Sequence, residues 1–95
     1  MIKYLDKNFN EEIKNKLILV DFYADWCGPC RMMGNVIENI NEIDVLKVNV
    51  DKHPSLAQEY MVMSIPTLML IENGKILKTN VGFMNEDEIR EFIKK

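Results

Sequence analysis

Cysteine and histidine are scarce in this sequence: of 95 residues, two are Cys and one is His. A structural zinc site normally takes four Cys or His ligands, so this chain would need a second chain to complete one. Four glycines and three prolines leave no linker or low-complexity stretch. We therefore expect residues 1–95 to form a single domain around one modest core.

The sequence also lacks long apolar runs and an excess of basic residues. No stretch approaches the roughly 20 apolar residues that span a bilayer, and MIKYLDKNFN at residues 1–10 lacks the apolar core of a signal peptide. Lys and Arg are scattered among Asp and Glu, and the net charge is −3, which argues against nucleic acid as a main partner. We expect a cytoplasmic protein without membrane or nucleic-acid partners. In that reducing compartment, a cysteine pair is more often catalytic or metal-binding than structural.

The apolar pattern of the chain predicts an α/β fold. The run LILVDFY at 17–23 is apolar almost throughout, which is typical of a central strand buried on both faces. Helices are expected at 8–14, 31–40, 53–60 and after residue 85, and further strands at 45–50, 67–71 and 75–81. A strand, a helix and a second strand form a right-handed βαβ unit. The result is a mixed sheet flanked by helices, parallel at its centre, with an antiparallel hairpin at one side.

Three local signals support these boundaries. Asn8 and Asn85 are each followed three residues later by Glu, which predicts side-chain caps for the first and last helices. Asn73-Gly74 predicts a type I′ turn between the last two strands.

Both cysteines lie in WCGPC at residues 26–30, where the predicted central strand gives way to a helix. Ligands of open α/β sheets bind at this edge. Gly28 permits a tight turn and Pro29 suits the first helical position, so Cys27 should lie at the helix N-terminus, where free N–H groups stabilise a thiolate. Cys30 follows about one turn later, close enough to attack a mixed disulfide on Cys27. We favour redox chemistry over a structural disulfide, because closing so short a loop stabilises little.

Asp21 interrupts the apolar run, and two interpretations are open. It is either a strand-end carboxylate that faces water, or a buried acid whose pKa is raised by desolvation. We favour the buried acid, which would exchange a proton with Cys30 directly or through water. Pro66 precedes an apolar strand, a position where proline is tolerated, but few X–Pro bonds are cis and the sequence alone does not predict one.

Several motifs together resemble the thioredoxin family, in order and spacing, over essentially the whole chain. They are WCGPC after the strand with Asp21, KVNVD at 47–51, Ile65-Pro66-Thr67, Asn73-Gly74 and Val81-Gly82. A C-x-x-C motif alone is weak evidence, but WCGPC with the downstream Ile-Pro-Thr and Val-Gly is highly specific.

The resemblance implies a thioredoxin fold and the function of a protein disulfide reductase, an electron carrier that works by dithiol–disulfide exchange. It makes Cys27 the attacking thiolate and Cys30 the resolving thiol. Asp21 would be the buried acid, and Pro66 a cis-proline packed against the cysteines. Lys47 would be the lysine beside Asp21; the alternative is that its side chain simply reaches water. The implied docking residues are Trp26, Gly28, Pro29, Ile65, Val81, Gly82 and Phe83.

The resemblance also implies partners, and two alternative functions must be weighed against a reductase. The partners are disulfide-containing client proteins and a thioredoxin reductase, either an NADPH flavoprotein or a ferredoxin-linked enzyme; no bound cofactor is needed, and the chain would be a monomer. One rival function is a docking module with incidental cysteines, which the intact WCGPC argues against. The other is an oxidant or isomerase, which the Gly-Pro between the cysteines argues against.

The remaining residues of interest receive simpler interpretations. We expect Met33 and Met69 in the core, and Met63 and Met84 on the docking surface. His53 is expected in a loop or at a helix start.

Overall fold

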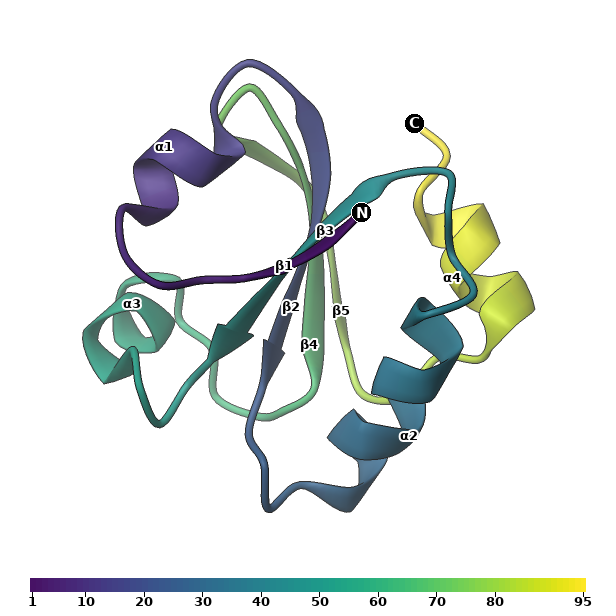
Figure 1. Cartoon of the computed structure of the whole chain (residues 1–95), viewed down its shortest axis with the longest axis horizontal. Coiled ribbons are helices and arrows are strands. Elements are labelled where there is room, and N and C mark those ends of the chain that lie inside the picture. Colours follow the sequence, from purple (N-terminus) through teal and green to yellow (C-terminus); the bar gives the residue numbers. More distant parts are fainter.

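The computed structural model describes residues 1–95 as a five-stranded sheet with four helices (Figure 1). The strands are β1 (Ile2–Tyr4), β2 (Leu17–Tyr23), β3 (Asp44–Asn49), β4 (Thr67–Glu72) and β5 (Lys75–Val81). The helices are α1 (Phe9–Ile13), α2 (Gly28–Ile37), α3 (Pro54–Glu59) and α4 (Glu86–Phe92). The predicted α/β class, with a mixed sheet flanked by helices, is confirmed.

The sheet has the strand order β1-β3-β2-β4-β5, so β2 is its central strand, as predicted. β3 pairs parallel to β2 on one side, whereas β4 pairs antiparallel to it on the other. The predicted parallel pairing of β2 with β3 and the antiparallel β4–β5 hairpin are confirmed, but the change of direction falls at β2 itself, which was not predicted. The segment between β3 and β4 holds only the short helix α3, and β4 starts at the edge where β2 ends, with Thr67 opposite Phe22.

Strand β1 was not predicted. Its three residues are too few to show a periodic pattern, and it forms by parallel pairing with β3, in which Tyr4 lies opposite Lys47. Its existence therefore depends on a partner more than 40 residues away in the sequence. This pairing brings an N-terminal tyrosine next to a lysine near the middle of the chain.

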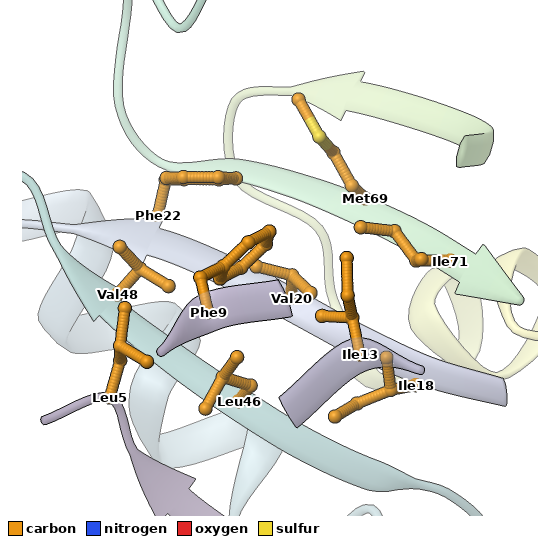
Figure 2. Close-up of a cluster of buried hydrophobic side chains, with 10 residues drawn as sticks. All are labelled: Leu5, Phe9, Ile13, Ile18, Val20, Phe22, Leu46, Val48, Met69 and Ile71. Atoms are coloured by element: carbon orange, nitrogen blue, oxygen red, sulfur yellow. The ribbon is translucent and has the colours of Figure 1, made fainter. Parts of the chain in front are cut away.

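Alternate residues of each strand face opposite sides of the sheet. Figure 1 shows α1 and α3 on one side of the sheet and α2 and α4 on the other. We call these the α1/α3 face and the α2/α4 face. The α1/α3 face buries the cluster drawn in Figure 2: Leu5, Phe9, Ile13, Ile18, Val20, Phe22, Leu46, Val48, Met69 and Ile71. The α2/α4 face buries Leu19, Met33, Ile37, Ile40, Ile43, Val45, Leu68, Leu70, Met84 and Ile89.

The local signals had different outcomes. Asn85 and Glu88 form the predicted capping box at the start of α4. Asn73 and Gly74 both have positive φ angles, 51° and 82°, as a type I′ turn requires. The cap at Asn8 was wrong: this residue adopts a left-handed conformation with φ 62°, and its side chain makes no cap hydrogen bond. Its backbone carbonyl instead accepts hydrogen bonds from the amides of Glu11 and Glu12.

Candidate active site

A disulfide between Cys27 and Cys30 lies at the N-terminus of α2. Cys27 is the N-cap residue in an extended conformation, and its sulfur accepts a hydrogen bond of 3.2 Å from the amide of Cys30. The helix begins at Gly28, one residue before Pro29, the predicted first helical position, and Cys27 lies at its N-terminus as predicted. Because the first amides of a helix point out of its end, they favour negative charge on a sulfur at this place.

The cysteine pair is nearly covered. Cys27 is 5% exposed and Cys30 is 2% exposed, so only a small part of either residue meets solvent. The two pack with Ala24 and touch Val50 and Ile65. Most of the surface of both cysteines is therefore covered by neighbouring residues.

The segment before β4 lies against the cysteine pair. The sulfur of Cys27 is 3.9 Å from the carbonyl oxygen of Ile65. The Ile65–Pro66 peptide bond is cis, and Pro66 is buried. The hydroxyl of Thr67 donates a hydrogen bond of 2.6 Å to the carbonyl of Ser64, which fixes this turn. The cis bond implied by the resemblance is thus present, although the sequence alone did not predict it.

Asp21 and Lys47 form a buried ion pair on the α2/α4 face. They lie opposite each other on β2 and β3, and the Lys47 Nζ is 3.4 Å from the Asp21 Oδ2. This distance suits a charge interaction, but neither carboxylate oxygen has an aligned hydrogen-bond partner. Asp21 is 0% exposed, which excludes the water-facing interpretation. The side chain of Lys47 is 10% exposed, so it does not extend into water either.

Burial is the main influence on the Asp21 carboxyl. The pKa of Asp21 is raised from 3.8 to about 6, because desolvation by burial outweighs the lowering effect of Lys47. An acid with a pKa near 6 is largely ionised at neutral pH, yet it can still be protonated by a neighbour. The predicted buried acid with a raised pKa is therefore confirmed.

A hollow of about 500 Å³ opens beside this ion pair. Its lining includes Cys30 and Lys47, together with Tyr4 and Tyr23. Cys30 and the lysine of the ion pair thus border the same hollow. Asp21 itself does not line the hollow, because its carboxyl is fully buried.

Exposed apolar side chains surround the disulfide. Trp26 is 69% exposed, Val81 62% and Phe83 43%. The indole nitrogen of Trp26 donates a hydrogen bond of 2.9 Å to Asp51. The amide of Gly82 donates one of 2.8 Å to the carbonyl of Pro66, which holds the 81–83 segment beside the cis-proline. Three segments far apart in the sequence therefore meet around the cysteines.

The structure shows where the singled-out methionines and His53 lie. Met33 and Met69 are core residues, as expected, at 0% and 3% exposure. Met63 is 93% exposed, but Met84 is 7% exposed and packs in the cluster of the α2/α4 face, so its assignment to the docking surface was wrong. His53 is the N-cap residue of α3, and its ring nitrogen lies 3.2 Å from the carbonyl oxygen of Leu5.

Two residues near the site were missed. Tyr4 and Tyr23 both place their rings near the Lys47 ammonium, at 5.7 and 4.7 Å. Tyr23 follows Asp21 by two residues on the same strand, so both side chains lie on one face of the sheet. This spacing is a sequence signal that could have identified Tyr23. Nothing in the sequence points to Tyr4, because only the pairing of β1 with β3 brings it there.

No helix of the structure combines the length and the apolar character needed to cross a membrane. The structure also has no group of three or more His, Cys, Asp or Glu side chains placed to hold a metal ion.

Known proteins resemble this chain in both sequence and fold. A sequence model of the family described as Thioredoxin matches residues 1–95. The thioredoxin of Bacillus subtilis (strain 168) is 35% identical, and that of Staphylococcus haemolyticus (strain JCSC1435) 40% identical; each alignment covers 100% of this chain and 96% of the relative. A solved structure of a mutant thioredoxin from Halobacterium salinarum NRC-1 has a TM-score of 0.87 at 35% identity, covering 97% of this chain and 87% of that one.

These likenesses extend over the full length of the chain and include the segment that carries the Cys27–Cys30 disulfide. Relatives of this kind are protein-disulfide oxidoreductases that act on disulfide-containing client proteins. The chain belongs to the thioredoxin family, and it carries out dithiol–disulfide exchange through its Cys27–Cys30 pair.

Proposed function

We propose that this protein is a reductant of client disulfides in which Cys27 attacks and Cys30 resolves. The observation that carries the proposal is the position of Cys27 at the N-terminus of α2, with its sulfur 3.2 Å from the amide of Cys30. In the dithiol form, that amide and the helix end favour a thiolate on Cys27. Cys27 is also the more exposed of the two cysteines.

The reaction transfers two electrons to the client. The Cys27 thiolate attacks one sulfur of the client disulfide, forming a mixed disulfide and releasing the first client thiolate. The Cys30 thiol then loses its proton and attacks the Cys27 sulfur, which releases the second client thiolate. The client leaves as a dithiol, and the protein is left with its own disulfide.

Asp21 is the proposed acceptor of the Cys30 proton. Its carboxyl is buried, its pKa is about 6, and its partner Lys47 borders the same hollow as Cys30. A base with a pKa close to the working pH is suited to both taking and returning a proton. Lys47 has a supporting role: its positive charge lowers the pKa of Asp21 and so helps the buried carboxyl to stay ionised.

The client would dock on the apolar surface around Cys27. We assign this docking surface to Trp26, Gly28, Pro29, Ile65, Val81, Gly82 and Phe83, with Pro66 closing it against the cysteines. The wide exposure of Trp26 and Val81 supports the assignment. Ile65, two residues from β4, has a backbone that is not tied into the sheet, so it can pair with an extended client segment. Such pairing reads backbone rather than sequence and suits varied clients.

We further propose that the chain acts as a single domain of residues 1–95, as a monomer in the cytoplasm. A thioredoxin reductase would restore the dithiol after each turnover. The Cys27–Cys30 pair carries both electrons, so the exchange itself calls for no further bound group.

Trapping of the mixed disulfide tests the assignment of the two cysteines. Cys30→Ser should accumulate a covalent complex with a disulfide-containing client, because the resolving thiol is absent. Cys27→Ser should accumulate none, although it keeps one thiol and serves as the matched control. Non-reducing electrophoresis and mass spectrometry detect the adduct. Trapping by Cys27→Ser instead would reverse the roles, and full function of the double serine variant would favour a docking module.

A further inference from the structure

Two tyrosines flank the ammonium of Lys47. Its Nζ is 4.7 Å from the centre of the Tyr23 ring and 5.7 Å from that of Tyr4. Both distances fall within the range of about 6 Å in which a ring face attracts a cation. The two rings meet edge to face, with centres 6.2 Å apart and planes at 78°. The Lys47 ammonium therefore has two aromatic neighbours in addition to the Asp21 carboxylate.

The sheet register explains how the rings reach Lys47. β3 lies between β1 and β2, and Lys47 has Tyr4 opposite it on one side and Asp21 on the other. Tyr23 follows Asp21 by two residues and so shares its face of the sheet. One ring consequently comes from each neighbouring strand, and the strands are fixed by their backbone hydrogen bonds.

Lysine needs such neighbours to stay at this place. Its four methylene groups would let the ammonium move out into the adjoining hollow of about 500 Å³. The contact to Asp21 is 3.4 Å and lacks hydrogen-bond alignment, so it is a weak tether by itself. From the side of α2 the ammonium is confined by Gly34, where even a Cβ would lie 3.2 Å from it.

We propose that Tyr4 and Tyr23 are positioning residues that hold the Lys47 ammonium against Asp21, and so keep Asp21 available as a carboxylate for the Cys30 proton. The inference rests on the proposed role of Asp21 in proton transfer. Neither ring needs to touch the reacting sulfurs for this. The faces of the two rings act, rather than their hydroxyl groups.

Other charged groups face the same hollow and stay constant in the test. They are Asp25, after β2, Arg31 of α2, and Glu38, the C-cap residue of α2. The guanidinium of Arg31 donates a hydrogen bond of 3.3 Å to the backbone carbonyl of Asp25. None of the substitutions below changes them, and Cys30 is kept in its disulfide during the measurement.

The experiment is a double-mutant cycle read out on Asp21. Tyr4→Leu with Tyr23→Leu removes the ring faces but keeps apolar bulk, whereas Tyr4→Phe with Tyr23→Phe keeps the faces and removes the hydroxyls. Each pair is made with Lys47 and with Lys47→Met. The pKa of Asp21 is measured by carbon NMR titration of its carboxyl in the oxidised protein, and far-UV circular dichroism checks the fold.

We expect the leucine pair to raise the pKa of Asp21 by roughly 0.5 or more, because the freed ammonium moves away from the carboxylate. The phenylalanine pair should leave it unchanged. With Lys47→Met, the leucine pair should have no effect. An unchanged pKa in the leucine pair, an equal shift with Lys47→Met, or an equal shift in the phenylalanine pair would each overturn the proposal.

This result is separable from the fate of the proposed function. If Asp21→Asn left the exchange rate unchanged across pH 6–9, the proton-transfer role of Asp21 would be wrong even with the expected NMR result. If both hold, the pH midpoint of the exchange rate should move upward in the leucine pair together with the Asp21 pKa.

Discussion

The two faces of the sheet are built differently. The α1/α3 face buries a cluster of ten apolar side chains, including Phe22 at 0% exposure, and no ionisable side chain (Figure 2). The α2/α4 face buries an apolar cluster of equal size, but it also buries Asp21 and Lys47. Both kinds of residue alternate along the same strand, with Phe22 directly after Asp21. One face thus contributes stability alone, while the other gives up stability to hold ionisable groups.

The cost on the α2/α4 face is the desolvation of Asp21. Its pKa is about 6 in the folded protein, against 3.8 for the exposed group. The folded state therefore binds a proton more tightly than the unfolded state, and this group's contribution to stability falls as the pH rises from about 4 to 6. Above that range the penalty stays constant at up to about 3 kcal/mol, since one pKa unit corresponds to about 1.4 kcal/mol.

The largest effect is expected on the apolar face. Phe22→Ala should lower the free energy of unfolding by about 3–5 kcal/mol, because it removes a buried ring and leaves a cavity. Urea unfolding monitored by circular dichroism measures the loss. The rate of disulfide exchange per folded molecule should stay the same, since the ring faces away from Asp21. A large loss of exchange in the folded fraction would show that the two faces are coupled.

The opposite sign is expected on the other face. Asp21→Asn should raise the free energy of unfolding at pH 7.5, by no more than about 3 kcal/mol, because the amide carries no charge to desolvate and the unpaired Lys47 ammonium can move into the adjoining hollow. The gain should vanish near pH 4, where the wild-type acid is protonated as well. Exchange should be slower in this variant. Urea unfolding at the two pH values measures the gain, and an equal stability difference at both would contradict the burial account.

The smallest effect is expected at a cap on the α2/α4 side. Asn85→Ala should cost about 1 kcal/mol, because the Glu88 amide at the start of α4 loses its side-chain acceptor. Thermal unfolding measures the loss. The dependence of stability on pH between 4 and 6 should match that of the wild type, which separates a purely structural residue from the ion pair on the same face.

Much of this organisation can be predicted from local sequence signals. The bounds of β2, the Asn73-Gly74 turn and the Asn85 capping box all depend on residues close together in the chain, and all were confirmed. Asp21 was predictable because a carboxylate within an apolar run is unusual wherever the strand lies. These signals fix the central strand and the position of the cysteines at its end.

Most of the errors concern contacts between distant segments, and one concerns a local backbone conformation. β1 consists of three residues that form a strand only beside β3, and the placement of Tyr4 against Lys47 follows from that pairing. Asn8 has the sequence of a cap, but the chain enters α1 through a left-handed turn that points its side chain elsewhere. Met84 lies next to exposed Phe83, yet its side chain packs between the sheet and helices α2 and α4. Sequence neighbours do not decide such cases.

The most direct test of the reductant assignment is an equilibrium redox titration of the Cys27–Cys30 pair against a dithiol buffer, followed by Trp26 fluorescence. Trp26 is the only tryptophan and adjoins Cys27, so its emission should report the state of the pair. We expect a strongly reducing potential of about −270 mV, the value typical of thioredoxin. A potential near −120 mV, as in strong protein oxidants, would contradict the proposed direction of electron flow.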